Sequence, residues 1–196
     1  MAAVGWQLWA RWQISQDTVA AQRYVTAQTA ADAADQSSAA GAATSAPSNQ
    51  AAAIAALEQA AATAPEGYRT LSRLRAAGLK ADAGDLSGAI ALWDQVAADP
   101  AADRLLRDLA GLMAAQHQLD HGDPAQLEAR LKPLAASDNP WSALAREQLA
   151  LLDLRQGKVT EAKATLQALS IDLAAPAGLR QRAAALFTGL GAGHGE

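Results

Sequence analysis

The chain has 196 residues and a formal net charge of -4, and 51% of its residues are apolar although only 4% are aromatic. The acidic balance, without a basic patch, argues against nucleic-acid binding, and the absence of cysteine excludes disulfides, thiolate catalysis and zinc-finger sites. Alanine supplies most of the apolar residues, and this composition suits close-packed helices better than sheets. Because no segment alternates apolar and polar residues, we expect an all-α protein without strands.

The first stretch, residues 1–14, is rich in tryptophan and apolar residues. Trp6, Trp9 and Trp12 are three residues apart and would lie on one side of a helix. Tryptophan is enriched at the membrane–water interface, and the apolar run is about half of the ~20 residues that span a bilayer. We therefore interpret residues 1–14 as the outer end of an incomplete N-terminal membrane anchor. The alternative is a tryptophan face that packs on the rest of the protein.

Residues 15–64 predict an imperfect first unit of two helices. Residues 15–35 are polar and rich in Gln and Ala, and they predict a long helix. The stretch 36–49 consists mainly of Ser, Gly and Ala without periodicity, which indicates a mobile loop. Residues 50–63 predict a second helix, which ends before Pro65.

The segment 65–175 contains a pattern that occurs three times. Each copy has a glycine, an alanine seven positions before it, and apolar residues five, nine and twelve positions after it. The copies are Ala77, Gly84, Ala89, Trp93 and Val96; then Ala115, Gly122, Leu127, Leu131 and Leu134; then Ala150, Gly157, Ala162, Leu166 and Leu169. Self-similarity at this period predicts stacked helical hairpins, because one hairpin cannot bury its apolar faces alone.

The pattern also predicts where the helices begin and end. We expect paired helices over 67–82 and 86–98, 102–120 and 124–136, and 141–155 and 159–170. Each glycine should supply the left-handed residue that ends a first helix, and Asp85 and Asp123 should cap second helices. Pro133 is expected to kink its helix. Within the terminal segment 176–196, a helix over 176–190 would cap the array, and a flexible tail would follow.

This pattern resembles the tetratricopeptide repeat, in which a small residue, a glycine turn, an alanine, a bulky apolar residue and a proline recur. The clearest copy runs from Ala77 through Gly84 and Trp93 to Pro100. The middle copy departs from the family, with Leu127 where alanine is usual. The resemblance implies a tetratricopeptide-like helical-hairpin solenoid with a long N-terminal helix.

The order of the segments resembles a more specific family. The chain begins with a tryptophan-rich stretch from Gly5-Trp6 to Tyr24. A join at Pro65-Glu-Gly-Tyr68-Arg69, three repeats and a terminal helix after Pro176 come next, in this order. This order is similar to that of the YfgM-like family of envelope proteins, the ancillary subunit of the bacterial SecYEG translocon. The chain departs from the family in lacking the basic cytoplasmic tail and most of the membrane helix. The resemblance implies a bacterial inner-membrane protein whose repeat domain lies in the periplasm.

Few residues are candidates for chemistry. His117 and His121 are four apart on one predicted helix, a spacing that could bind a metal, but neither an HExxH glutamate nor a third ligand accompanies them. We therefore interpret them as part of a solvated helix end. The sequence also lacks a nucleophile elbow and a phosphate-binding loop. We predict no catalytic, cofactor-binding or metal-binding residues, and hence a protein that is not an enzyme.

The predicted interaction surface is a groove lined by the first helix of each hairpin, as in tetratricopeptide arrays. Eight leucines are assigned to this predicted groove: Leu71, Leu74, Leu109, Leu112, Leu119, Leu144, Leu151 and Leu154. So much apolar surface is not left against water. Either part of the same protein fills the groove, or a partner segment binds in it.

Two functions remain open from the sequence. The first is a membrane-anchored periplasmic adaptor that works with the translocon, with envelope chaperones or with unfolded polypeptide. The second is a soluble tetratricopeptide scaffold of another envelope assembly, such as outer-membrane biogenesis or cell division. Both are non-enzymatic protein–protein interaction scaffolds.

Overall fold

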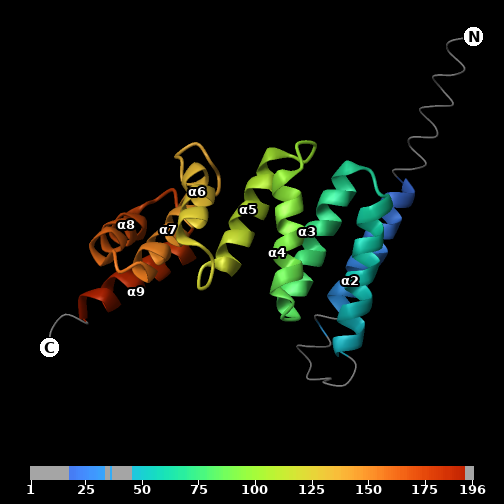
Figure 1. Ribbon diagram of the computed structural model, residues 1–196, viewed down its shortest axis with the longest axis horizontal. Coiled ribbons are helices and arrows are strands. Elements are labelled where there is room, and N and C mark those ends of the chain that lie inside the picture. Colours follow the sequence, from blue (N-terminus) through green and yellow to red (C-terminus); the bar gives the residue numbers. More distant parts are fainter. Residues whose placement is uncertain (1–17, 34–35, 37–45, 193–196) are drawn as a thin grey trace, which may run out of the picture. The chain divides into compact units, whose positions relative to one another are not determined.

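A computed structural model of the chain describes residues 18–33, 36 and 46–192. Figure 1 shows these residues as helices joined by turns, and no strand occurs among them. The prediction of an all-α protein is thus confirmed for the part of the chain that the structure describes. The chain divides into two compact units, and the boundary between Arg107 and Asp108 falls within one helix.

The helices follow one another with short connections. An unlabelled helix covers residues 18–33. The others are α2 (Ala46–Thr63), α3 (Glu66–Asp82), α4 (Leu86–Ala98), α5 (Arg104–Gln118), α6 (Pro124–Leu134), α7 (Ser142–Arg155), α8 (Val159–Ile171) and α9 (Ala177–Ala192). From α3 onward, every bound agrees with the sequence prediction to within two residues. The clearest difference is α2, which begins at Ala46 and so includes the last residues of the predicted loop 36–49.

The first unit is held together by alanine. The helix over residues 18–33 packs on α2, and α3 lies against both α2 and α4 (Figure 1). The core cluster contains four alanines and two leucines: Ala27, Ala31, Ala53, Leu57, Ala76 and Leu79. Because alanine side chains are small, the helix backbones approach closely without a loss of helix propensity. At one end of the helices the rings of Tyr24 and Tyr68 lie 6.0 Å apart between centroids.

The second unit is organised around α7, which packs on α6 with one face and on α8 with another. On the face toward α6, Ala145 and Leu152 of α7 belong to a core cluster that also contains Leu112, Ala115, Leu127, Leu131 and Leu134. Ala143 and Ala150 contact the second cluster, which also contains Leu166, Leu169, Ala175, Leu179 and Ala183. The last helix, α9, covers α8 through Leu179 and Ala183.

The repeated sequence pattern marks the contacts inside each hairpin. All twelve side chains of the pattern, leaving the glycines aside, are at most 7% exposed. Trp93 is the largest of them and is 2% exposed. In the second and third hairpins the small residue of the first helix shares one core cluster with the large residues of the second, as the pattern predicts.

The three turn glycines serve two different purposes. Gly84 and Gly157 have φ values of 84° and 76°, the left-handed conformation that favours glycine at a helix end. Gly122 has no positive φ, so the prediction was wrong for the middle hairpin. A Cβ at Gly122 would lie 2.8 Å from the carbonyl oxygen of Gln118 and 3.2 Å from Leu127 Cδ1. Glycine is required there by close approach, chiefly because the backbone carbonyl of Gln118 leaves no room for a Cβ.

Two of the predicted helix caps are confirmed. The Asp85 carboxylate accepts a hydrogen bond from the Gly88 N–H at 2.9 Å, and Asp123 accepts one from the Gln126 N–H at 2.9 Å. Each satisfies an amide that the first turn of a helix leaves without a partner. Pro133 lies inside α6, one residue before its last residue Leu134, and the helix ends two residues earlier than predicted.

The membrane predictions fall mainly on residues that the structure does not describe. Trp6, Trp9 and Trp12 lie outside the described residues, as do most of the predicted loop and the last four residues. Within the described ranges, no helix combines the length and the hydrophobicity needed to cross a bilayer.

Candidate functional site

Two leucines of the predicted groove belong to the first unit, and both reach its surface. Leu71 on α3 is 37% exposed, and Leu74, one turn further along the same helix, is partly buried. Neither belongs to the alanine-rich core cluster. These two side chains therefore form a small apolar surface on α3.

The six leucines in the second unit divide into three groups. Leu112 is 3% exposed and lies in the core with Leu127 and Leu131, so a partner segment cannot reach it. Leu119 and Leu144 are partly buried and pack against the core. The remaining three are partly buried and lie outside the core clusters: Leu109, Leu151 and Leu154.

The sequence pattern explains why Leu112 differs from its neighbours. Leu109, Leu112 and Leu119 stand thirteen, ten and three residues before Gly122, close to one line along the helix. The position ten residues before the glycine is buried in the second and third hairpins, where Leu112 and Glu147 occupy it. In the first hairpin Leu74 occupies the same position and is only partly buried.

Glu147 was not singled out from the sequence, although it is a carboxylate buried on α7 between Leu144 and Leu151. Arg182 of α9 binds it through two hydrogen bonds, from Nε to Oε1 at 3.0 Å and from Nη2 to Oε2 at 2.8 Å. The Glu147 side chain is 5% exposed and the Arg182 side chain 57%. The hydrogen bonds to Glu147 raise the pKa of Arg182 above its ordinary value. This pair fixes α9 against α7 and places a charge within an otherwise leucine-rich surface.

Arg155, at the end of α7, makes a second contact that the sequence did not indicate. Its guanidinium donates hydrogen bonds to the backbone carbonyls of Leu119 and Gly122, in the turn between α5 and α6. Carbonyls at a helix end lack partners within the helix, and an arginine fork is well suited to bind two of them. Arg155 therefore holds the partly exposed Leu119 in place beside α7.

An ion pair closes the first and the third hairpin in the same way. Arg73 of α3 binds Asp99, which follows α4, and Arg146 of α7 binds Asp172, which follows α8. In each pair the arginine stands eleven residues before the turn glycine and the aspartate fifteen residues after it. Asp99 and Asp172 also accept the N–H of the residue two positions later, as Asn139 does after the middle hairpin. We call this arrangement the Arg–Asp clamp.

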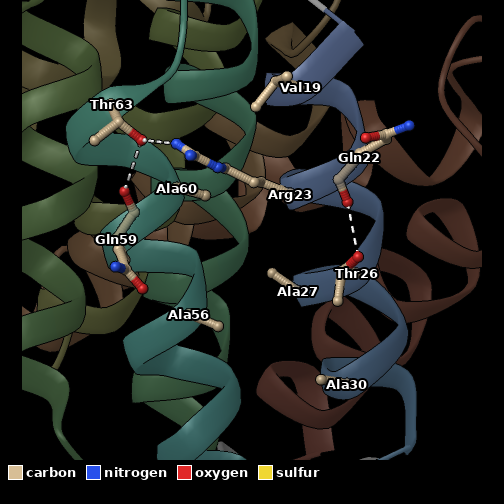
Figure 2. Close-up of a pocket in the computed structure, with 10 residues that line it drawn as sticks. All are labelled: Val19, Gln22, Arg23, Thr26, Ala27, Ala30, Ala56, Gln59, Ala60 and Thr63. Carbon is tan, nitrogen blue, oxygen red and sulfur yellow. Dashed lines mark hydrogen bonds between the residues drawn. The ribbon is translucent and has the colours of Figure 1, made fainter.

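A hollow in the described part of the first unit lies between the helix over residues 18–33 and α2 (Figure 2). Its volume is about 640 Å3, and its walls are mainly alanine, threonine and glutamine. Arg23 crosses it to donate to the Thr63 hydroxyl at 3.1 Å, and Thr26 donates to the backbone carbonyl of Gln22 (Figure 2). Arg23 is the one ionisable side chain among the described residues that line the hollow, so this lining offers no acid and base pair for catalysis.

The histidines do not form part of a metal site in the described residues. His117 lies in the last turn of α5 and is partly buried, whereas His121 is exposed in the following turn. Nowhere in the described ranges do three or more His, Asp or Glu side chains converge in a way that could hold a metal ion.

Comparisons with known proteins add no relative. No family model matches the chain, and neither a curated protein nor a solved structure is significantly similar to it.

Proposed function

We propose that the chain is a non-enzymatic protein–protein interaction scaffold built from tetratricopeptide-like hairpins. The observation that carries the proposal is the agreement between the first and third hairpins, which share buried pattern residues, a left-handed glycine and an Arg–Asp clamp at equal positions. Repeated hairpins of this kind present one face of every first helix to solvent. Recognition of polypeptide through that face is the function that the geometry supports best.

In this proposal each unit binds through the leucines that remain at its own surface. In the first unit these are Leu71 and Leu74 on α3, and in the second unit they are Leu109, Leu119, Leu144, Leu151 and Leu154. Burying one leucine side chain contributes about 1.5–3 kcal/mol, and ordering a flexible segment offsets much of this. A few such contacts give weak, reversible binding that tolerates many apolar sequences, because apolar burial has no directional requirement.

The cellular setting of the proposal rests on the sequence. We base an N-terminal anchor in a bacterial inner membrane on Trp6, Trp9 and Trp12 and on the order of the segments. The repeats would then lie in the periplasm, near the Sec translocon or its chaperones. Polypeptides that leave a translocon are extended and apolar, which is the chemistry that a leucine surface binds. Anchoring at the exit raises the local concentration and compensates for weak affinity.

The experiment introduces charge at the exposed leucines of α7. Leu151→Asp together with Leu154→Asp should reduce crosslinking of the full chain to a permanently unfolded, apolar polypeptide by about tenfold, since one lost leucine contact is worth at least about 1.4 kcal/mol. The matched control is Thr160→Asp with Gln167→Asp, at exposed positions of α8. Circular dichroism verifies that both variants stay helical. If the leucine variant crosslinks as well as the control, the leucine surface is not the binding site.

A further inference from the structure

The last helix repeats the first half of a hairpin. Gly191 stands thirty-four residues after Gly157, an interval close to those between the other turn glycines. Seven and fourteen residues before Gly191 are Ala184 and Ala177, which correspond to Ala150 and Ala143 of α7. α9 therefore carries the alanines that a first helix presents to its own second helix.

The burial of α9 shows which of its faces is occupied. In α7, Ala145 and Leu152 pack on the preceding helix α6, whereas Ala143 and Ala150 pack on α8. In α9, Leu179 corresponds to Ala145 and Leu186 corresponds to Leu152. Leu179 is buried in the core cluster that α9 shares with α8, and Leu186 packs against this cluster. Ala177 and Ala184 of α9 correspond to Ala143 and Ala150 of α7, and both are exposed. Within the described residues, no helix follows α9 to cover them.

The same face carries the basic half of an Arg–Asp clamp. Arg180 stands eleven residues before Gly191, the position of Arg73 and Arg146 in the complete hairpins. There the arginine reaches an aspartate beyond the second helix, whereas the Arg180 guanidinium donates to the backbone carbonyl of Ala175 at 2.7 Å. The position of Arg180 is independent of the alanines, so a helix that covers this face needs an acidic group near Arg180.

We propose that the face of α9 formed by Ala177, Arg180 and Ala184 is a docking site for a partner's amphipathic helix. The chain itself shows the chemistry of that helix in its complete clamped hairpins. It has a small residue, large apolar residues four and seven positions later, and an aspartate three positions further, as in Ala89, Trp93, Val96 and Asp99 and again in Ala162, Leu166, Leu169 and Asp172. The site continues the hairpin interface already formed by α7 and α8.

A second copy of α9 is a poor occupant of this face. The exposed side chains of α9 around it are small or polar, among them Gln181 and Thr188. Two such faces would bury little apolar area, and area removed from water is the main stabilising contribution in helix packing. The large side chains have to come from the partner, and the acidic end of the partner helix matches the charge of Arg180.

The test uses a fluorescently labelled peptide with the sequence of residues 85–100, which contains the second-helix pattern and Asp99. Fluorescence anisotropy with the full chain should show saturable binding. Ala184→Arg fills the site and should weaken binding by about tenfold or more, because a large side chain at this position prevents the close approach of the partner helix. Ala185→Arg, at an exposed alanine one residue along, should leave binding unchanged.

A charge exchange tests the clamp separately. Arg180→Glu should weaken binding of the Asp99 peptide severalfold, and a peptide with Asp99→Arg should restore it, because the pair is then reversed. The proposal is overturned if the peptide does not bind, if Ala184→Arg and Ala185→Arg have equal effects, or if the exchanged peptide does not rescue Arg180→Glu. These outcomes do not depend on the leucine surface, which remains intact in every variant.

Discussion

The hairpins α3–α4 and α7–α8 have the same frame but exchange the charges of one ion pair. Lys80 binds Asp85 in the first hairpin, with 3.3 Å between Nζ and Oδ2, and the equivalent residues of the third are Asp153 and Lys158, with 3.7 Å between Nζ and Oδ1. In the first, the acid lies at the start of the second helix and caps it. In the third, a lysine lies there, and no side chain caps α8.

A second difference lies at the position ten residues before the glycine. Leu74 is partly buried in the first hairpin, whereas Glu147 is buried in the third and requires Arg182 from α9. The third hairpin thus needs a charged contact from the helix that follows it, at a position where the first hairpin has a leucine. The pattern residues specify the frame, while the residues between them decide how each hairpin is closed.

The largest effect is expected when the bulky residue of each second helix is removed. Trp93→Ala should cost about 3–5 kcal/mol of unfolding free energy and Leu166→Ala about 2–5 kcal/mol, because both side chains are almost fully buried and leave cavities. Urea denaturation followed by circular dichroism measures both. A cost below about 1 kcal/mol for either would show that the two hairpins do not share one packing scheme.

Removing the arginine that Glu147 requires should have the next largest effect. Arg182→Ala leaves a buried carboxylate without its partner and should cost about 1–3 kcal/mol. Glu147→Leu, which copies Leu74 of the first hairpin, should be close to neutral, and adding Arg182→Ala to it should cost little more. If Arg182→Ala costs as much in the Glu147→Leu variant as in the wild type, α7 does not depend on α9 through this pair.

Exchanging the charges of the third hairpin should make it more stable. Asp153→Lys with Lys158→Asp copies the order found in the first hairpin and places an acid at the start of α8. A side-chain cap contributes about 0.5–2 kcal/mol, so we expect a gain in unfolding free energy of about 1 kcal/mol. The reverse exchange, Lys80→Asp with Asp85→Lys, should lose more than this, because Lys80 also binds Glu58 of α2 at 3.1 Å. Unchanged stability in both variants, measured by urea denaturation, would mean that the cap at Asp85 is unimportant.

The smallest effect concerns pH. The hydrogen bond from Arg146 lowers the pKa of Asp172 below its ordinary value, with a further contribution from the Ala174 N–H. A lowered folded-state pKa stabilises the protein above the unfolded pKa, and this stabilisation is lost as the pH falls through the folded pKa. Asp172→Asn should therefore be less stable than the wild type at neutral pH and equal to it in acid. Thermal melts across this range that differ by a constant amount would contradict the prediction.

The regular part of the structure was predictable because few residues decide it. Ala77, Trp93 and their equivalents identified the hairpin contacts, and Asp85 and Asp123 marked helix starts through their local capping chemistry. Gly122 was misread because a glycine needed for close approach and one needed for a left-handed turn look alike in a sequence.

The surface was less predictable, because it depends on contacts between distant residues. Leu112 stands on the same line as Leu109 and Leu119, and only three-dimensional packing shows that it is interior. The partners of Glu147 and Arg155 lie more than thirty residues away in the chain. One signal was available for Glu147, since it is a charge at a position where the other two hairpins have leucine.

Site-specific photocrosslinking tests the central claim, polypeptide recognition by the leucine surface, most directly. A photoreactive amino acid replaces Leu151 in one full-length variant and Thr160 in another, and each is irradiated with the same unfolded, apolar polypeptide. Leu151 is partly buried on α7, and Thr160 is exposed on α8. We expect strong crosslinks from position 151 and only background from position 160. Equal crosslinking from the two positions, or none from position 151, would contradict the account.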